Sequence, residues 1–294
     1  MRASSSLTWG GCTIPGDGGV PAVAVSLTGP TAAHARAQAR HAIDAGADVL
    51  ELRVDLLEEV DALVAFTEAP GEEPSTTDSM VVTTAAAQVL ECLRRMADVV
   101  DVTPLLLTCR TAAEGGRARL DDSGYSALLR SVLDELAGWE PGRRPSAVDV
   151  EVQRGCLLQV SEQAHGLGID VVASFHDFKT TPADDVLEDV LSRMASEGAD
   201  LAKIAVWPTG ADDVARLLGV CARAAAAPGE GTGLGLPVAA MSMGALGAVS
   251  RVAPVFGSAL TFAVVPDEQG ETQASAPGQL PIQDVRRCLE LLRA

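Results

Sequence analysis

The sequence has 294 residues, of which 47% are hydrophobic and 21% are charged, a composition that excludes a largely disordered chain. Its 40 acidic and 22 basic residues leave a net charge of −18, so we expect neither nucleic acid nor an anionic membrane surface as a partner. It has no stretch of about 18 consecutive apolar residues, so no transmembrane helix is predicted.

Short apolar runs alternate with amphipathic helical segments along the chain. The predicted strands are residues 22–27, 49–54, 105–109, 148–152, 171–175, 201–206, 238–241 and 259–265. Amphipathic helices are predicted at residues 32–45, 125–136, 156–165, 183–196, 211–226 and 282–292. Strand–helix units repeated in this way favour a (β/α)8 TIM barrel, an α/β fold, over an open doubly wound sheet. No GxGxxG motif follows the first strand, which weakens a dinucleotide-binding interpretation.

Two segments stand outside this alternation. Residues 8–14 precede the first strand and predict a short hairpin that closes the floor of the barrel. Residues 67–84, rich in Glu, Pro, Ser and Thr, lie between the second strand and its helix and predict a flexible insertion. Neither segment has the character of a domain boundary, so we interpret residues 1–294 as a single barrel domain.

The six cysteines are spaced singly, without a CxxC pair. This spacing is typical of reduced, buried thiols and not of a disulfide framework or a structural zinc site. Residues 1–19 lack the apolar core of a secretory signal. We therefore expect a cytoplasmic protein without a bound metal.

Ionisable residues of equal parity gather on single faces of two predicted strands. Glu51, Arg53 and Asp55 share one face of the second strand, and Asp149 and Glu151 share one face of the fourth. A structural ion-pair ladder or a ligand site would satisfy these charges, because an unpaired buried charge is costly. We expect Asp149 and Glu151 to be structural partners of a site and not direct catalysts.

Lysine is scarce in this chain, which contains only Lys179 and Lys203. Lys203 lies in the middle of the apolar sixth strand, an unusual place for this residue type. Burial, helped by a neighbouring cation such as Arg53 or Arg251, would lower its pKa and leave a neutral amine. Such an amine is a nucleophile towards ketones and aldehydes.

His176 follows the fifth strand, which neighbours the strand of Lys203 in a closed barrel. An imidazole there would carry protons for an imine formed on Lys203. The structural alternatives are a histidine satisfied within the core and a lysine that is merely paired with Glu51 or Glu151.

Seven stretches of the sequence, in order, together resemble the type I 3-dehydroquinate dehydratase (3-dehydroquinase) family. They extend from Ser26 to Gln279 and are ELRVDLL, TCRTAAEGG, SFHDFKTTP, LAKIAVWP, MSMGALGAVSRV, FGSALTFA and ASAPGQLP. The resemblance implies a carbon–oxygen lyase that removes water from 3-dehydroquinate through a lysine imine, giving 3-dehydroshikimate. It also implies a place in the shikimate pathway of aromatic amino acid biosynthesis, no cofactor, and a homodimer.

The resemblance also assigns roles to individual residues. It implies that Lys203 forms the imine, that His176 is the general acid and base, and that Glu114 orients His176. It implies that Arg251 binds the substrate carboxylate. The remaining substrate-binding positions that it implies are Ser26, Glu51, Arg53, Arg110, Ser275 and Gln279, with Phe178, Met243 and Phe262 as apolar neighbours of the ring.

Two alternatives remain open at this point. A class I aldolase uses the same barrel and imine but needs a phosphate-binding loop after the last strands, which GALGAVSR superficially matches. A barrel that only binds a carbocyclic acid would keep Arg251 and Gln279 but would not need both Lys203 and His176. Turnover of dehydroquinate separates these alternatives from the dehydratase.

Overall fold

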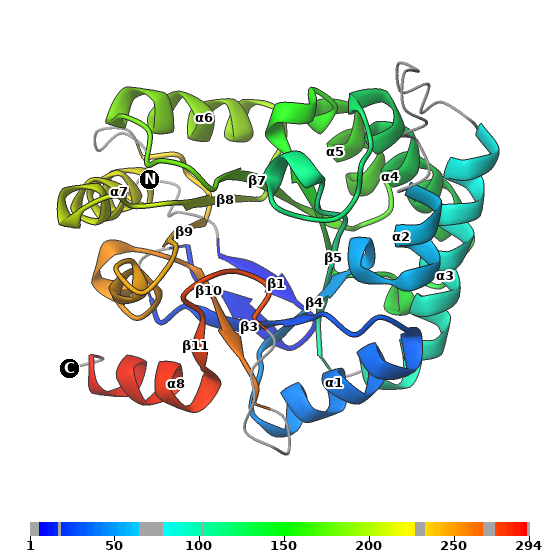
Figure 1. Cartoon of the computed structure of the whole chain (residues 1–294), viewed down its shortest axis with the longest axis horizontal. Helices are drawn as coiled ribbons and strands as arrows, with labels where there is room; N and C mark the ends of the chain where they lie inside the picture. The colour runs from blue at the N-terminus through cyan, green and yellow to red at the C-terminus, as the bar shows by residue number, and fades with distance from the viewer. Residues whose placement is uncertain are drawn as a thin grey trace.

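The computed structural model describes residues 6–16, 19–64, 79–100, 103–226, 233–266 and 274–292. Parallel strands lie in chain order around a barrel, with the helices on its outside (Figure 1). The barrel strands are β3 (Ala22–Leu27), β4 (Val49–Arg53), β5 (Leu105–Thr108), β6 (Ala147–Glu151), β7 (Asp170–Asp177), β8 (Leu201–Val206), β9 (Val238–Ser242) and β10 (Leu260–Val264). Every predicted strand is therefore present, and the predicted (β/α)8 barrel is confirmed.

Neighbouring strands pair in parallel from β3 to β9, and β10 returns to pair with β3. The seam between β9 and β10 is narrow: one bridge joins Val238 and Ser258, and the backbone N–H of Ala259 donates to the Val238 carbonyl at 2.7 Å. A short strand, β11 (Leu280–Pro281), extends the edge of β10. Because the barrel strands are parallel, their carboxyl ends meet at one rim, where TIM barrels build their functional sites.

Helices follow most strands and cover the outside of the barrel. They are α1 (Ala32–Asp44), α2 (Glu58–Val64), α3 (Ser79–Val100), α4 (Asp122–Leu136), α5 (Leu157–His165), α6 (Asp184–Ser196), α7 (Ala211–Ala224) and α8 (Ile282–Leu291). Side-chain caps start two of them: Thr31 accepts the backbone N–H of His34 at α1, and Asp121 accepts that of Gly124 at α4. All six helices predicted from periodicity are present. No helix in the described ranges combines the length and apolarity needed to cross a bilayer.

The alternation of side chains divides the core into two layers. Residues such as Leu50, Leu52 and Val148 face outward and pack with the helices. Residues of the other parity face the barrel interior, where Leu106 and Val172 lie towards the floor. The polar residues at the upper end of the same inward faces are therefore placed at the rim by the register of the strands.

The predicted hairpin closes the lower end of the barrel. It consists of the antiparallel strands β1 (Leu7–Trp9) and β2 (Cys12–Ile14). Trp9 is only 2% exposed and packs with the lower interior layer, and its indole N–H donates to Asp170 Oδ2 at 2.8 Å. The floor is thus filled by an apolar side chain, and the rim is the open end.

One expectation from the sequence needs both restriction and correction. The predicted insertion at residues 67–84 falls mostly on residues 65–78, which lie outside the described part of the chain. Residues 79–84 form the first turns of α3, because Val82, Ala85 and Ala86 at helical spacing bury against the core; the prediction of a loop there was wrong. The seventh strand–helix unit, for which no helix was predicted, has no α-helix in the described part of the chain. Residues 243–259 form only the 3-10 turns Ala248–Arg251 and Pro254–Phe256 in place of an α-helix.

Candidate active site

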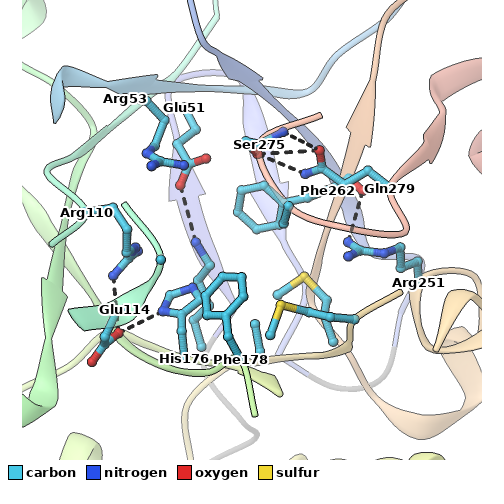
Figure 2. A pocket seen from close by; sticks show the side chains of 16 residues that line it. Glu51, Arg53, Arg110, Glu114, His176, Phe178, Arg251, Phe262, Ser275 and Gln279 are labelled. Atoms are coloured by element: carbon cyan, nitrogen blue, oxygen red, sulfur yellow. Dashed lines mark hydrogen bonds and ion pairs between the residues drawn. The ribbon is translucent and has the colours of Figure 1, made fainter. Parts of the chain in front are cut away.

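A pocket of about 480 Å³, including its open mouth, lies at the carboxyl rim of the barrel (Figure 2). Twelve of the thirteen predicted site residues line it, together with Gly115, Ala205, Met241 and Ala276. The twelve are Glu51, Arg53, Arg110, Glu114, His176, Phe178, Lys203, Met243, Arg251, Phe262, Ser275 and Gln279. Ser26 lies just behind them and bonds to two of them. The fold therefore brings together residues that the sequence spreads from Ser26 to Gln279.

Lys203 projects from the middle of β8 into the barrel and is 5% exposed. Its Nζ lies 3.3 Å from Glu51 Oε1 and 3.5 Å from Asp149 Oδ2. The ring of Phe262 approaches the ammonium from another side, with its centroid 4.3 Å from Nζ. The closest charged neighbours are thus carboxylates from β4 and β6, in place of the arginines or Glu151 considered from the sequence.

Glu51 is held in place by strands on both sides of it. Ser26 on β3 donates to Oε2, and Thr108 on β5 donates to Oε1 at 3.1 Å. Burial would raise the pKa of Glu51, but Lys203 and Arg53 outweigh burial and bring its pKa to about 2. Glu51 is therefore a fixed negative charge beside the lysine.

The two arginines of the pocket floor are tied to buried carboxylates. Arg53 forms a two-pronged pair with Asp55, at 2.8 Å from Nε to Oδ1 and 2.7 Å from Nη2 to Oδ2. Arg110 Nη2 donates to Asp149 at 2.8 Å, and its Nη1 donates to Glu151 at 3.2 Å. The Arg53–Asp55 pair belongs to the ion-pair ladder that the sequence left open for Glu51, Arg53 and Asp55, and all these contacts fix the guanidinium groups within the pocket wall.

His176 and Glu114 form a buried pair at one side of the pocket (Figure 2). His176 Nδ1 lies 2.9 Å from Glu114 Oε2, while Glu114 Oε1 is buried without a hydrogen-bond partner. Burial, then the positive charges of Arg110 and Lys203, lower the pKa of His176 well below 6.5. Nδ1 is engaged by Glu114, which leaves Nε2 as the nitrogen available to a ligand.

Burial also shifts the carboxyl group of this pair. It raises the pKa of Glu114 to about 8, although the nearby Arg110 acts in the opposite direction. Phe178 packs against the next residue along the chain: its ring would lie 2.3 Å from a β-carbon placed on Gly115, which has φ +83°. A glycine is therefore required beside Glu114 for the aromatic ring to occupy this position.

Arg251 lies across the pocket from this pair (Figure 2). Its side chain is almost fully buried, and among the described residues it donates only to carbonyl groups, at 3.1 Å to Pro277 and 3.5 Å to Phe262. Its Nε has no partner, and within the described residues no carboxylate lies within 4 Å of its guanidinium. Burial lowers the pKa of Arg251 to about 10. A buried cation without a counter-ion is suited to bind an anion from outside the protein.

Residues 274–279, which directly precede β11, complete the lining of the pocket. Ser275 donates to Ser26 at 2.8 Å and accepts from Gln279 Nε2 at 3.1 Å. Gly278, with φ +79°, packs so closely on Gly244 that an added β-carbon would lie 2.3 Å from the Gly244 carbonyl oxygen. The Ser275 hydroxyl donates to the Ser26 hydroxyl, which in turn donates to the Glu51 carboxylate, so this segment is connected to Glu51 through two hydroxyl groups.

Sequence reasoning missed three polar residues that complete these contacts. Thr108 supports Glu51, Ser174 donates to Asp149 at 2.7 Å, and Thr111 donates to Glu151 at 2.6 Å. Thr108 and Ser174 share the inward parity of Arg110 and His176 along their strands, a signal that was applied only to charged residues. In the described ranges no group of three or more His, Cys, Asp or Glu residues is arranged to hold a metal ion.

Comparisons with known proteins place this geometry in one family. The family model described as type I 3-dehydroquinase matches residues 23–294. A 3-dehydroquinate dehydratase of Listeria monocytogenes is 34% identical over 277 residues, 93% of each chain. One of Klebsiella pneumoniae is 34% identical over 273 residues, 92% of each chain. The crystal structure of the Geobacillus kaustophilus 3-dehydroquinate dehydratase is 27% identical, with a TM-score of 0.79 over 99% of this chain and 98% of the other.

Proposed function

This chain belongs to the type I 3-dehydroquinase family, and we propose that it removes water from 3-dehydroquinate through an imine on Lys203 to give 3-dehydroshikimate. It is accordingly a hydro-lyase, and its product continues towards the aromatic amino acids. The observation that carries the proposal is one pocket that holds a buried lysine, a histidine of lowered pKa and an arginine without a counter-ion. The lysine would react with the ketone of the substrate, the histidine would take the proton of its acidic C–H bond, and the arginine would bind its carboxylate.

Binding begins with the carboxylate of the substrate. Arg251 would receive it, because its guanidinium otherwise contacts only carbonyl groups. The ring then extends across the pocket towards Lys203, between the apolar side chains of Phe178, Met243 and Phe262. Its remaining hydroxyl groups would meet the polar wall made by Glu51, Arg53, Arg110, Ser26, Ser275 and Gln279.

The ketone of the bound substrate reacts with Lys203. Attack by Nζ and loss of water form a protonated imine, which accepts the electron pair of a neighbouring C–H bond far better than a ketone does. Glu51 remains ionised beside it, since its pKa is about 2, and stabilises the positive nitrogen. The C–H bond next to the imine thereby becomes acidic enough to be broken at neutral pH.

His176 then takes that proton and returns it to the departing hydroxyl. Its lowered pKa keeps the imidazole neutral at the start, with Nε2 free to accept a proton. Glu114 holds Nδ1 at 2.9 Å and so fixes the ring while the imidazolium exists. Elimination of the hydroxyl that lies β to the original ketone gives the conjugated imine, and hydrolysis frees Lys203.

The same pocket argues against the aldolase alternative. The segment that would form its phosphate loop contains only a short 3-10 turn, and the group it offers to the pocket is the Arg251 guanidinium. A guanidinium fork pairs well with a planar carboxylate. The Arg251 guanidinium therefore fits the carboxylate of a dehydratase substrate better than the phosphate of an aldolase substrate.

We propose two further properties that the family resemblance implies. Two copies would associate as a homodimer, in keeping with the exposed apolar residues Leu246, Val249 and Val255 where the seventh unit lacks an α-helix. The protein would work in the cytoplasm, in keeping with six cysteines that are all unpaired. Sedimentation velocity at several concentrations tests the first property, and a persistent monomer would contradict it.

Turnover of 3-dehydroquinate tests the proposed function. The product is a conjugated enone, so ultraviolet absorbance follows its formation directly. We expect turnover by the natural chain and none by Lys203→Ala. Absence of turnover by the natural chain would contradict the proposed function. Equal turnover by both proteins would show that the reaction does not proceed through an imine on Lys203.

A further inference from the structure

We propose that Asp149 is a catalytic residue that carries protons between the Lys203 nitrogen and the substrate oxygen during imine formation and hydrolysis. The inference rests on the proposed function and adds a second proton carrier to it. His176 acts on the ring carbons and the leaving hydroxyl, whereas Asp149 acts on the nitrogen. Sequence analysis had expected only a structural role for Asp149.

The position of Asp149 is the first support. It lies on the inward face of β6, is fully buried, and its two carboxylate oxygens have different partners. Oδ1 accepts from Arg110 at 2.8 Å and from Ser174 at 2.7 Å. Oδ2 faces Lys203 Nζ at 3.5 Å, and within the described residues no other donor contacts it. One oxygen thus anchors the carboxylate, and the other is left to exchange a proton with the lysine.

The other groups near Lys203 are poorly suited to this task. Glu51 is nearer, at 3.3 Å, but Ser26 and Thr108 donate to its two oxygens. Its pKa of about 2 also makes it a weak proton acceptor. His176 has Nδ1 committed to Glu114, and its Nε2 is needed at the ring carbon. Asp149 Oδ2 is therefore the group best placed to accept a proton from Lys203 Nζ.

The protons of imine formation balance through this carboxylate. Asp149 takes one proton from the ammonium, and the freed nitrogen pair forms the C–N bond while the carbonyl π pair moves to oxygen. The proton then passes to that oxygen. A second proton follows the same route from nitrogen to the hydroxyl, which leaves as water as the C=N bond forms. The water released contains the ketone oxygen and two of the three ammonium protons, and Asp149 ends as a carboxylate.

Asp149→Asn separates a proton carrier from a mere counter-charge. If Asp149 only stabilised the ammonium, its loss would favour the neutral amine, and imine formation would be as fast as before or faster. If Asp149 carries the proton, imine formation slows even though the amine is more readily neutral. Asparagine keeps an oxygen for Arg110 and Ser174, so the anchoring contacts survive.

Glu151→Gln is the matched control. Glu151 is also a fully buried carboxylate of β6 that binds Arg110, but among the described residues its side chain contacts Arg110, Thr111 and Arg154 and not Lys203. The Glu151→Gln substitution removes one negative charge from the same cluster without changing a direct neighbour of Lys203 Nζ. A general weakening of the cluster would affect both variants, whereas loss of the proton carrier affects Asp149→Asn alone.

The experiment measures the rate of imine formation in a single turnover. Enzyme in excess is mixed with 3-dehydroquinate, quenched with borohydride at increasing times, and the reduced adduct on the Lys203 peptide is quantified by mass spectrometry. We expect Asp149→Asn to form the adduct at least about 100-fold more slowly than the natural chain, the lower end of the contribution of an acid–base group, and Glu151→Gln to stay within about threefold.

Each other outcome has a definite meaning. An unchanged or faster rate in Asp149→Asn, or an equal slowing in both variants, overturns the inference. If the natural chain forms no adduct, the proposed function itself fails. If Asp149→Asn does not fold, as judged by circular dichroism, Ser174→Ala is measured instead, since it keeps the charge but loosens the anchor of Oδ1. We expect slower adduct formation in Ser174→Ala, and an unchanged rate overturns the inference.

Discussion

His176 Nδ1 and Glu114 Oε2 lie 2.9 Å apart, and burial changes the proton affinity of both residues. Burial lowers the pKa of the imidazole and raises that of the carboxyl group. Both shifts favour uncharged forms. The imidazole is therefore neutral at neutral pH, with Nε2 free to accept a substrate proton, while Glu114 holds Nδ1.

Deletion of the imidazole should stop the reaction after the covalent step. His176→Ala retains Lys203 and Arg251, so substrate still binds and forms an imine, but no base removes the ring proton. We expect turnover to fall by at least about 10²–10⁴-fold, the contribution of a positioned acid–base group. Intact-protein mass spectrometry without reductant should show accumulated substrate adduct. Turnover near the natural rate would mean that another group is the base.

The ionisation of Glu114 should make stability depend on pH. Its pKa in the folded protein is about 8, against an ordinary value of 4.5, so the folded state holds this proton more tightly than the unfolded state. The stability that this group contributes is complete below about pH 4.5 and is lost as pH rises towards 8. Glu114→Gln cannot ionise and should therefore gain stability relative to the natural chain over that range.

Urea unfolding of both proteins at several pH values measures this difference. His176 has the opposite dependence, because its lowered folded pKa costs stability below about pH 6.5. The comparison is clearest between pH 6.5 and 8, above the range in which His176 contributes and below the folded pKa of Glu114. A constant difference across that range would show that Glu114 is already ionised in the folded protein.

Replacement of Arg251, the proposed binding residue for the substrate carboxylate, by lysine should weaken binding of the transition state. Arg251→Lys keeps the positive charge but loses the planar fork that pairs with a carboxylate. We expect kcat/KM to fall by the equivalent of about 2–4 kcal/mol, the scale of breaking a buried charged hydrogen-bonded pair. Steady-state kinetics give the value directly. An unchanged kcat/KM would show that the carboxylate binds elsewhere.

The contact between Gly278 and Gly244 should position the loop that carries Ser275 and Gln279. Gly278→Ala introduces a β-carbon 2.3 Å from a backbone oxygen at a left-handed φ, so the loop must move and its two polar groups move with it. We expect a raised KM and a smaller loss of kcat. Gly210→Ala is the control, since nothing lies within 4 Å of its added β-carbon. Equal kinetics in both variants would mean that the loop contact is not used in binding.

The sequence was sufficient for the barrel because hydrophobic alternation is a local property. The strand of Lys203 has the predicted bounds, Leu201–Val206, because its register depends only on neighbouring residues. The partners of Lys203 could not be read in this way. Parity placed both Asp149 and Glu151 on the inward face, but only the stagger between β6 and β8 decides that Asp149 reaches Nζ. The start of α3 was missed because a polar, proline-containing run just before it masked the helical spacing.

Borohydride trapping of the natural chain tests the central claim most directly, because it asks which atom becomes bonded to the substrate. Only two lysines exist, so a digest distinguishes the buried Lys203 from Lys179. With 3-dehydroquinate and borohydride present together, we expect loss of activity and one reduced adduct, on the peptide that contains Lys203. An adduct on Lys179, or sustained turnover with no adduct on either lysine, would contradict the account.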